Sequence, residues 1–184
     1  VNFPHFIEFA NDNRLAGIRL NSAMISSADI DEGFKVLKWA PTTVPLYFDI
    51  KARQLRVVEA IYYKDHLELE MNHAITVDTP QVVLFKAGND RAVLKEVKNG
   101  TRLIFEGGQP HYKVKAGESL HIRHHSLIVH EPIFTDLEVE KVDKIIAARF
   151  KKYYLSYVED QKEIDWLRNK IGPDAELVLK IESE

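Results

Sequence analysis

Polar side chains follow the apolar runs of this chain at the points where the predicted strands end. They are basic, acidic, amide and hydroxyl side chains: Arg19, Asn21, Asp49, Lys51, Arg56, Ser156, Lys180 and Glu182. Arginine and lysine suit a phosphate group, whereas carboxylate and amide oxygens suit hard cations such as Mg²⁺. Together these residues predict phosphoryl transfer, in which positioning and charge neutralisation supply most of the catalysis. Each of them taken singly has a plainer interpretation, in which it is solvated or caps the next helix.

Lys180 and Glu182 differ from the other candidates because they lie within a segment of leucine, valine and isoleucine. Residues at this spacing share one face of a strand. If that face is buried, each of the two charges needs a partner. This pair therefore stands out from the other candidates.

The two ends of the chain alternate between helical and extended patterns. Phe6, Ile7 and Ala10 recur at helical spacing, Ser27 offers a cap for a second helix, and Thr135 with Glu138 predicts a capping box for a third. Short apolar runs between the helices predict strands at 16–20, 44–50, 153–158 and 177–181. This rhythm is typical of a parallel sheet wrapped by helices. A closed barrel of this kind has eight strands, so we expect an α/β fold that is part of a (β/α)8 barrel.

The central segment has a different period. Leu67, Leu69 and Met71 alternate with Glu68 and Glu70, which gives one wet and one dry face. Similar short runs, separated by turn residues, predict strands at 55–61, 66–71, 81–86, 91–97, 101–106, 111–116 and 119–124. This pattern predicts a small antiparallel barrel or sandwich. We therefore divide the chain into a first barrel segment at 1–51, an inserted all-β domain at 52–133, and a second barrel segment at 134–184.

The composition narrows the class of protein. The chain has 184 residues, 25 Lys+Arg against 28 Asp+Glu, and a net charge of −3, which gives no electrostatic reason to expect nucleic acid or a membrane surface as a partner. It contains no cysteine, so disulfides and thiolate metal sites are excluded, and a reducing cytoplasm is the expected location. No apolar run approaches the length that spans a membrane.

Four segments, in this order, resemble the motifs of pyruvate kinases. Residues 18–21 (IRLN) resemble the A-R-L-N-F-S-H strand of that family, and residues 49–56 (DIKARQLR) resemble its D-x-K-G-P-E-I-R segment, which leads into an inserted lid domain. Residues 156–158 (SYV) resemble its S-F-V motif, and residues 179–183 (LKIES) resemble its K-I-E-N strand end. The resemblance spans nearly the whole chain and includes the position of the β-rich insertion.

The resemblance implies transfer of phosphate from phosphoenolpyruvate to ADP, giving pyruvate and ATP. By this resemblance, Arg19 would bind the transferring phosphate and Lys180 would stabilise the phosphoryl group. Arg56 and Lys51 would contact the nucleotide. Asn21 and Asp49 would be ligands of K⁺, and Glu182 would be a ligand of Mg²⁺ or Mn²⁺. The lid would close over the nucleotide and exclude water. The missing strands would come from the remainder of the barrel or from another copy in a homo-oligomer, without which the chain is expected to be inactive.

The chain also departs from the family pattern. Ala23 stands where the family has a serine that supplies a cation ligand, Ala52 and Arg53 replace the Gly-Pro of the hinge, and Glu159 replaces an arginine. These differences keep two alternatives open. One is a degenerate, non-catalytic relative of pyruvate kinase that binds a ligand or a protein partner. The other is a different barrel enzyme that uses phosphoenolpyruvate.

Overall fold

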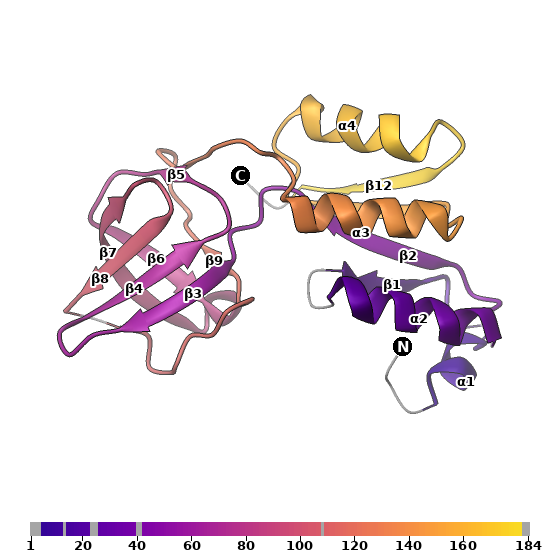
Figure 1. Cartoon of the computed structure of the whole chain (residues 1–184), viewed down its shortest axis with the longest axis horizontal. Coiled ribbons are helices and arrows are strands. Elements are labelled where there is room, and N and C mark those ends of the chain that lie inside the picture. Colours follow the sequence, from indigo (N-terminus) through magenta and orange to yellow (C-terminus); the bar gives the residue numbers. More distant parts are fainter. Residues whose placement is uncertain (1–4, 13, 23–25, 40–41, 108, 182–184) are drawn as a thin grey trace. The chain divides into compact units, whose positions relative to one another are not determined.

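The computed structural model describes residues 5–12, 14–22, 26–39, 42–107 and 109–181. The chain forms two compact units (Figure 1). One unit, called here the α/β unit, comprises Val1–Ala52 and Asp136–Glu184, and the other, the β unit, comprises Arg53–Thr135. The sequence predicted the inserted domain at 52–133, whereas the β unit begins and ends slightly later, at Arg53 and Thr135.

A four-stranded sheet forms the centre of the α/β unit. Its strands, in spatial order, are β1 (Ile18–Asn21), β2 (Leu46–Lys51), β11 (Lys152–Ser156) and β12 (Glu176–Lys180). Each neighbouring pair is parallel. The carboxyl ends of the strands therefore meet at one edge of the sheet.

Helices occupy the segments between these strands. They are α1 (Phe6–Ala10), α2 (Ser27–Trp39), α3 (Asp136–Ala147) and α4 (Gln161–Ile171), of which α2, α3 and α4 lie side by side over one face of the sheet (Figure 1). The local sequence explains the limits of α4. The Asp160 side chain accepts a hydrogen bond from the Lys162 backbone N–H within a capping box completed by Glu163, and Gly172 ends the helix with a φ of 80°. Within the described residues, no helix has the length and apolar character needed to cross a membrane.

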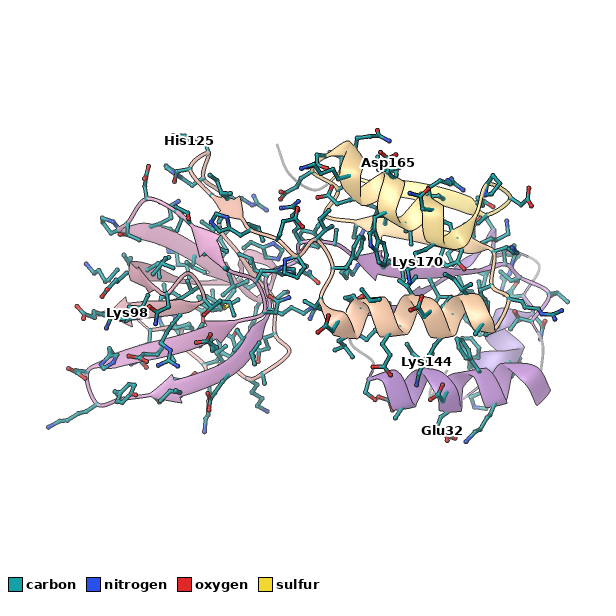
Figure 2. All side chains as sticks on the ribbon, turned by 45° about the horizontal axis from the view of Figure 1, so that its top comes forward. Glu32, Lys98, His125, Lys144, Asp165 and Lys170 are labelled. Atoms are coloured by element: carbon teal, nitrogen blue, oxygen red, sulfur yellow. The ribbon has the colours of Figure 1, made fainter. Side chains whose placement is uncertain are left out.

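The core of the α/β unit lies between the sheet and the helices. Phe48, Ile50, Tyr153 and Leu155 are buried on alternate positions of β2 and β11. Ion pairs at the surface link neighbouring helices: Lys144 of α3 lies 2.6 Å from Asp31 of α2, and Lys170 of α4 lies 2.7 Å from Asp143 of α3. Figure 2 labels the two lysines. Exposed pairs of this kind contribute about 0–1 kcal/mol each, so the apolar core provides most of the stability.

The β unit is built on a six-stranded antiparallel sheet. The strands, in spatial order, are β3 (Val57–Tyr62), β4 (His66–Met71), β8 (Arg102–Glu106), β7 (Asp90–Lys98), β6 (Gln81–Phe85) and β9 (Leu120–His121). A short pair, β5 (Ile75–Thr76) and β10 (Ile128–Val129), and the 3₁₀ turn η2 (Lys86–Gly88) complete it. Backbone hydrogen bonds join the two edges, for example from Val57 N to Glu118 O at 2.9 Å and from Leu120 N to Leu55 O at 3.2 Å. The sheet therefore curves around one buried core, which includes Leu69, Phe85 and Phe105.

Two of the predicted strands of this unit differ from the structure. Residues 111–116 are not a strand, and the strand predicted at 119–124 is limited to Leu120–His121. Hydrogen bonds that involve side chains, and not a strand ladder, fix the segment 111–116. The Val114 backbone N–H donates to the Tyr62 hydroxyl at 2.6 Å, and the Tyr112 hydroxyl donates to Glu118 at 2.6 Å. The alternation of residue types predicted a strand here, because a segment held by side-chain hydrogen bonds can show the same alternation as a strand.

His73 is a buried titratable group of the β unit. It is only 1% exposed. Burial lowers the pKa of His73 below its ordinary value, and the positive charge of Arg53 acts in the same direction. The backbone of Pro132 and the carboxylate of Glu131 act in the opposite direction and do not offset these effects. The ring is therefore neutral at neutral pH, and protonating it requires a charge in the interior.

Adjacent valines on β6 test the assignment of faces in the β unit. Val83 is 0% exposed and Val82 is 45% exposed. We expect Val83→Ala to cost about 2 kcal/mol of unfolding free energy, because it removes buried methyl groups and leaves a cavity. Val82→Ala is the matched control and should cost less than about 0.5 kcal/mol. Hydrogen exchange of the strand amides measures both, and equal losses would show that the faces are assigned wrongly.

The stability of the β unit should depend on pH through His73. Because the folded pKa lies below the unfolded value of 6.5, the unfolded chain binds the proton first. The contribution of His73 to the unfolding free energy is therefore fully present above pH 6.5. It decreases as the pH falls toward the folded pKa, by at most about 1.4 kcal/mol per pH unit. Urea denaturation followed by circular dichroism across this range measures the slope. His73→Gln should remove this part of the slope, and the exposed His125→Gln should not.

Candidate functional site

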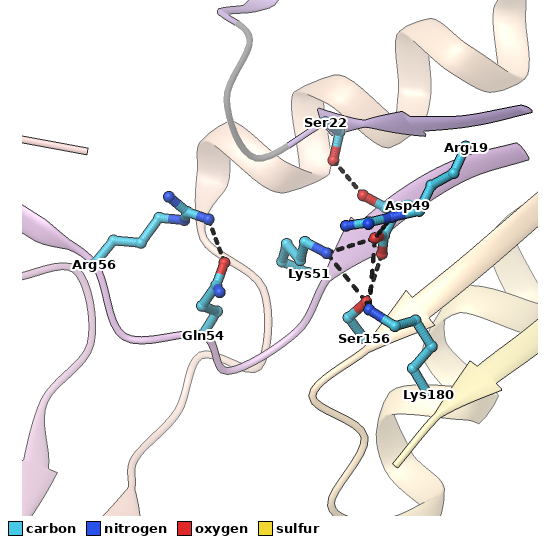
Figure 3. Close-up of polar contacts among 8 residues, drawn as sticks. All are labelled: Arg19, Ser22, Asp49, Lys51, Gln54, Arg56, Ser156 and Lys180. Atoms are coloured by element: carbon cyan, nitrogen blue, oxygen red, sulfur yellow. Dashed lines mark hydrogen bonds and ion pairs between the residues drawn. The ribbon is translucent and has the colours of Figure 1, made fainter. Parts of the chain in front are cut away.

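The Asp49 carboxylate is the centre of a polar cluster at the carboxyl ends of the parallel strands (Figure 3). Its Oδ2 accepts hydrogen bonds from Arg19 Nε at 2.5 Å and lies 2.6 Å from Lys51 Nζ. Its Oδ1 accepts a hydrogen bond from the Ser156 hydroxyl at 2.5 Å. Asp49 is fully buried, so these donors replace the water that an exposed carboxylate would bind. We call Arg19, Asp49, Lys51, Ser156 and Lys180 the Asp49 cluster.

The strand register brings these side chains together. Asn21 of β1 lies opposite Asp49 of β2, and Ser156 of β11 lies opposite both Lys51 of β2 and Lys180 of β12. Alternate residues of a strand point to the same face. The cluster therefore forms on the face opposite the apolar side chains Phe48, Ile50, Tyr153 and Leu155, and all four strands contribute to it.

Ser156 links the two lysines to the carboxylate. Its Oγ accepts hydrogen bonds from Lys51 Nζ and from Lys180 Nζ, both at 3.1 Å, while its own hydrogen is donated to Asp49. Lys180 Nζ also lies 3.8 Å from Asp49 Oδ2. The cluster thus contains three cationic side chains and one carboxylate. Counted over these five residues, the positive charges outnumber the negative one, which favours an anion as the ligand.

Burial and charge set the protonation states of the two inner groups. Burial by itself would raise the pKa of Asp49, but hydrogen bonds from Lys51, Ser156 and Arg19 outweigh it, so the pKa lies below its ordinary value. Burial lowers the pKa of Lys51, the hydrogen bond and charge of Asp49 oppose this, and the charges of Lys180 and Arg19 lower it further. The carboxylate is therefore firmly ionised. The ammonium of Lys51 is less stable than an exposed one and would gain from a nearby anion.

The outer members of the cluster reach solvent, and the inner ones do not. The side chains of Arg19 and Lys180 are 48% and 31% exposed, whereas that of Lys51 is 6% exposed. Within the described residues, Arg19 donates to Asp49 only through Nε, which leaves its two terminal nitrogens for another acceptor. An anion that approaches the sheet edge would meet Arg19 and Lys180 first.

A second layer of polar contacts supports the backbone of the cluster. The Ser22 hydroxyl donates to the Asp49 carbonyl at 2.7 Å, and the Ser22 carbonyl accepts from Lys141 Nζ at 3.0 Å. The same ammonium donates to Glu138 Oε1 at 3.0 Å, and Lys141 is almost completely buried. Helix α3 is thereby connected to the loop that follows β1.

The sequence did not point to Lys141. Val139, Val142, Ile145 and Ile146 recur at helical spacing and by themselves predict the buried stripe of α3, whereas the structure buries Glu138, Lys141, Val142 and Ile145. Glu138 and Lys141 share the helix face of Val142 and Ile145 because of their spacing. That spacing could have predicted that Glu138 and Lys141 lie on the buried face of the helix. The prediction was not made because charged residues are rarely buried unless they are paired.

The remaining predicted site residues are placed as follows. Asn21 lies next to Asp49 in the β1–β2 register. Arg56 belongs to the β unit, where its guanidinium donates to the Gly117 carbonyl at 2.6 Å and to the Gln54 side chain (Figure 3). Glu182 lies outside the described residues. The roles of these three residues remain predictions.

The predicted K⁺ site does not fit the arrangement around Asp49. Arg19 and Lys51 already lie within 2.6 Å of Asp49 Oδ2. A further cation about 4 Å from each of them would be repelled by roughly 4 kcal/mol per pair at an effective dielectric constant of about 20. Ala23, which stands where the resemblance places a hydroxyl ligand, has no side-chain oxygen.

Comparison with known proteins adds no assignment to this geometry. No protein-family model matches the chain, and no curated protein has a significantly similar sequence.

Asp49→Asn tests whether the cluster depends on this carboxylate. The change removes the only negative charge of the cluster and should cost about 3–5 kcal/mol, because buried Lys51 would lose its counter-charge. Asp143→Asn is the control, since it removes an exposed partner of Lys170 and should cost at most about 1 kcal/mol. Urea denaturation followed by tryptophan fluorescence is suitable, because Trp39 and Trp166 both belong to the α/β unit. Similar losses for the two variants would contradict the central role of Asp49.

Proposed function

We propose that the Asp49 cluster binds a phosphoryl or carboxylate group, and that the chain contributes this site to a phosphotransferase that resembles pyruvate kinase. One observation supports the proposal above all others. Arg19, Lys51 and Lys180 gather around one carboxylate at the carboxyl ends of parallel strands. Ligands of α/β folds commonly bind at this edge. The proposed reaction moves phosphate from phosphoenolpyruvate to ADP.

Each member of the cluster has a distinct role in this proposal. The terminal nitrogens of Arg19 would bind two oxygens of the anion, for which the planar guanidinium is well shaped. Lys180 would neutralise the charge on the group in transfer. Asp49 and Ser156 would hold the amines of Lys51 and Lys180 in place, at the distances they already have.

The proposal extends to groups that the resemblance implies. Mg²⁺ or Mn²⁺ would be held by Glu182, and ADP or ATP would be contacted by Arg56, with the β unit as a lid over the nucleotide. A cytoplasmic location fits the absence of cysteine from the sequence. Strands β1 and β12 lie at the two edges of the parallel sheet, and further strands, from the rest of a (β/α)8 barrel or from another copy, would pair with them.

A second candidate function is favoured by a specific contact. Arg19 Nε is bonded to Asp49 at 2.5 Å, and the sequence lacks the serine and histidine that follow the corresponding asparagine in pyruvate kinases. A relative that binds a phosphorylated ligand without turnover would keep the cationic cluster and lose these residues. Binding of phosphoenolpyruvate with Mg²⁺, without formation of pyruvate from ADP, would support this candidate over the enzyme.

Affinity for phosphoenolpyruvate should depend on the two exposed cations. We expect Arg19→Ala and Lys180→Ala each to weaken binding by about tenfold to a hundredfold, because each removes a hydrogen bond to a charged group. Lys152→Ala is the matched control, since Lys152 begins the strand that Ser156 ends and pairs there with Glu176. Titration calorimetry measures all three. Equal weakening by the control would show that only the general charge of the protein matters.

Turnover should be more sensitive than binding. In the complete protein, Lys180→Ala should lower kcat by about 10²–10³, because a contact to developing charge is lost. Pyruvate formation from phosphoenolpyruvate and ADP measures the rate. A variant with unchanged turnover would rule out the proposed role of Lys180.

A further inference from the structure

We infer that the Asp49 cluster supplies its own cations, so that anion binding at this site does not depend on K⁺ or another monovalent metal ion. The inference rests on the proposed function, because it concerns the same anion site. It replaces the K⁺ predicted at Asn21 and Asp49 with two groups of the protein. These are the ammonium of Lys51 and the guanidinium of Arg19.

Protein groups already surround the two carboxylate oxygens of Asp49. Oδ2 lies 2.5 Å from Arg19 Nε and 2.6 Å from Lys51 Nζ. Oδ1 accepts from the Ser156 hydroxyl at 2.5 Å. A carboxylate has room for about four donors in total, and three of these positions are filled by protein groups. A monovalent cation would have to displace one of them or approach two positive charges.

Lys51 is the group that is hardest to displace. Its side chain is 6% exposed, and its amine contacts both Asp49 and Ser156. If it left Asp49, it would have to carry its charge into a buried region or travel to solvent. An ammonium group and K⁺ are close in size, and both are bound by oxygen atoms. The amine of Lys51 thus occupies a position that suits K⁺ and gives the site a cation that is covalently part of the chain in place of an exchangeable one.

The contacts of Lys51 predict the effect of removing its amine. In Lys51→Met the side chain keeps a similar length and loses its charge, so one position on the Asp49 carboxylate becomes open. Ser156 Oγ and Asp49 Oδ2 then each lose their contact with Lys51, while Lys180 stays 3.1 Å from Ser156 Oγ and 3.8 Å from Asp49 Oδ2. The variant should therefore acquire a dependence on K⁺ that the natural protein lacks.

The test is titration of the protein with inorganic phosphate by calorimetry, in K⁺ and in tetramethylammonium at equal ionic strength. Tetramethylammonium is too large to replace K⁺ among oxygen ligands. For the natural protein we expect the two dissociation constants to agree within about twofold. For Lys51→Met we expect binding in tetramethylammonium to be at least about tenfold weaker, since a charge-assisted contact is lost, and to recover in K⁺. Lys152→Met is the matched control and should show no effect of the salt.

The possible outcomes separate the inference from the proposed function. Phosphate binding by the natural protein that requires K⁺ overturns the inference and leaves the anion site standing. Absence of phosphate binding in both salts overturns the anion site and, with it, the inference. If Lys51→Met does not fold, as its circular dichroism would show, the comparison of the two salts with the natural protein decides the matter by itself.

Discussion

The buried carboxylate of Asp49 is the constraint on which the α/β unit depends. A lone ionised carboxylate in an apolar interior costs several kcal/mol or more, so its donors must be in place whenever the unit is folded. Arg19, Lys51 and Ser156 supply them from three adjacent strands. A slip of one residue in any of these pairings would turn a member of the cluster toward the apolar face. The polar cluster thereby fixes the register that the apolar residues alone would leave less defined.

In the α/β unit, the apolar core provides the stability, and the polar cluster defines how the strands are arranged. Phe48, Ile50, Tyr153 and Leu155 bury the apolar surface, and burial of this kind contributes about 25 cal/mol per Å². The charges of the Asp49 cluster gain little net free energy, because desolvation offsets most of their mutual attraction. What they provide is a defined arrangement. The contact from Lys141 through Ser22 to the Asp49 backbone extends that arrangement to helix α3.

The β unit has a core of its own and a separate means of holding its ends together. Arg53, at its beginning, donates to the Val129 carbonyl at 2.6 Å and lies 3.2 Å from Glu131 near its end. The His130 backbone N–H donates to the Ala74 carbonyl at 2.8 Å. An inserted domain needs its two ends close together, and these contacts keep them so. His73 is buried beside this same arginine, so its protonation would disturb the part of the unit where the chain enters and leaves.

The sequence by itself determined the local patterns and the types of residue at the strand ends. Period-two and helical spacing placed most of the strands and helices, and the apolar runs marked Arg19, Asp49, Lys51 and Lys180 as the residues that end them. Only the tertiary structure decided which charge meets which. Asp49 and Ser156 are 107 positions apart in the chain, and their contact depends on strand order and register, which no local period encodes. For the same reason the resemblance to pyruvate kinases could imply a K⁺ ion at Asp49, whereas the folded chain surrounds this carboxylate with its own cations.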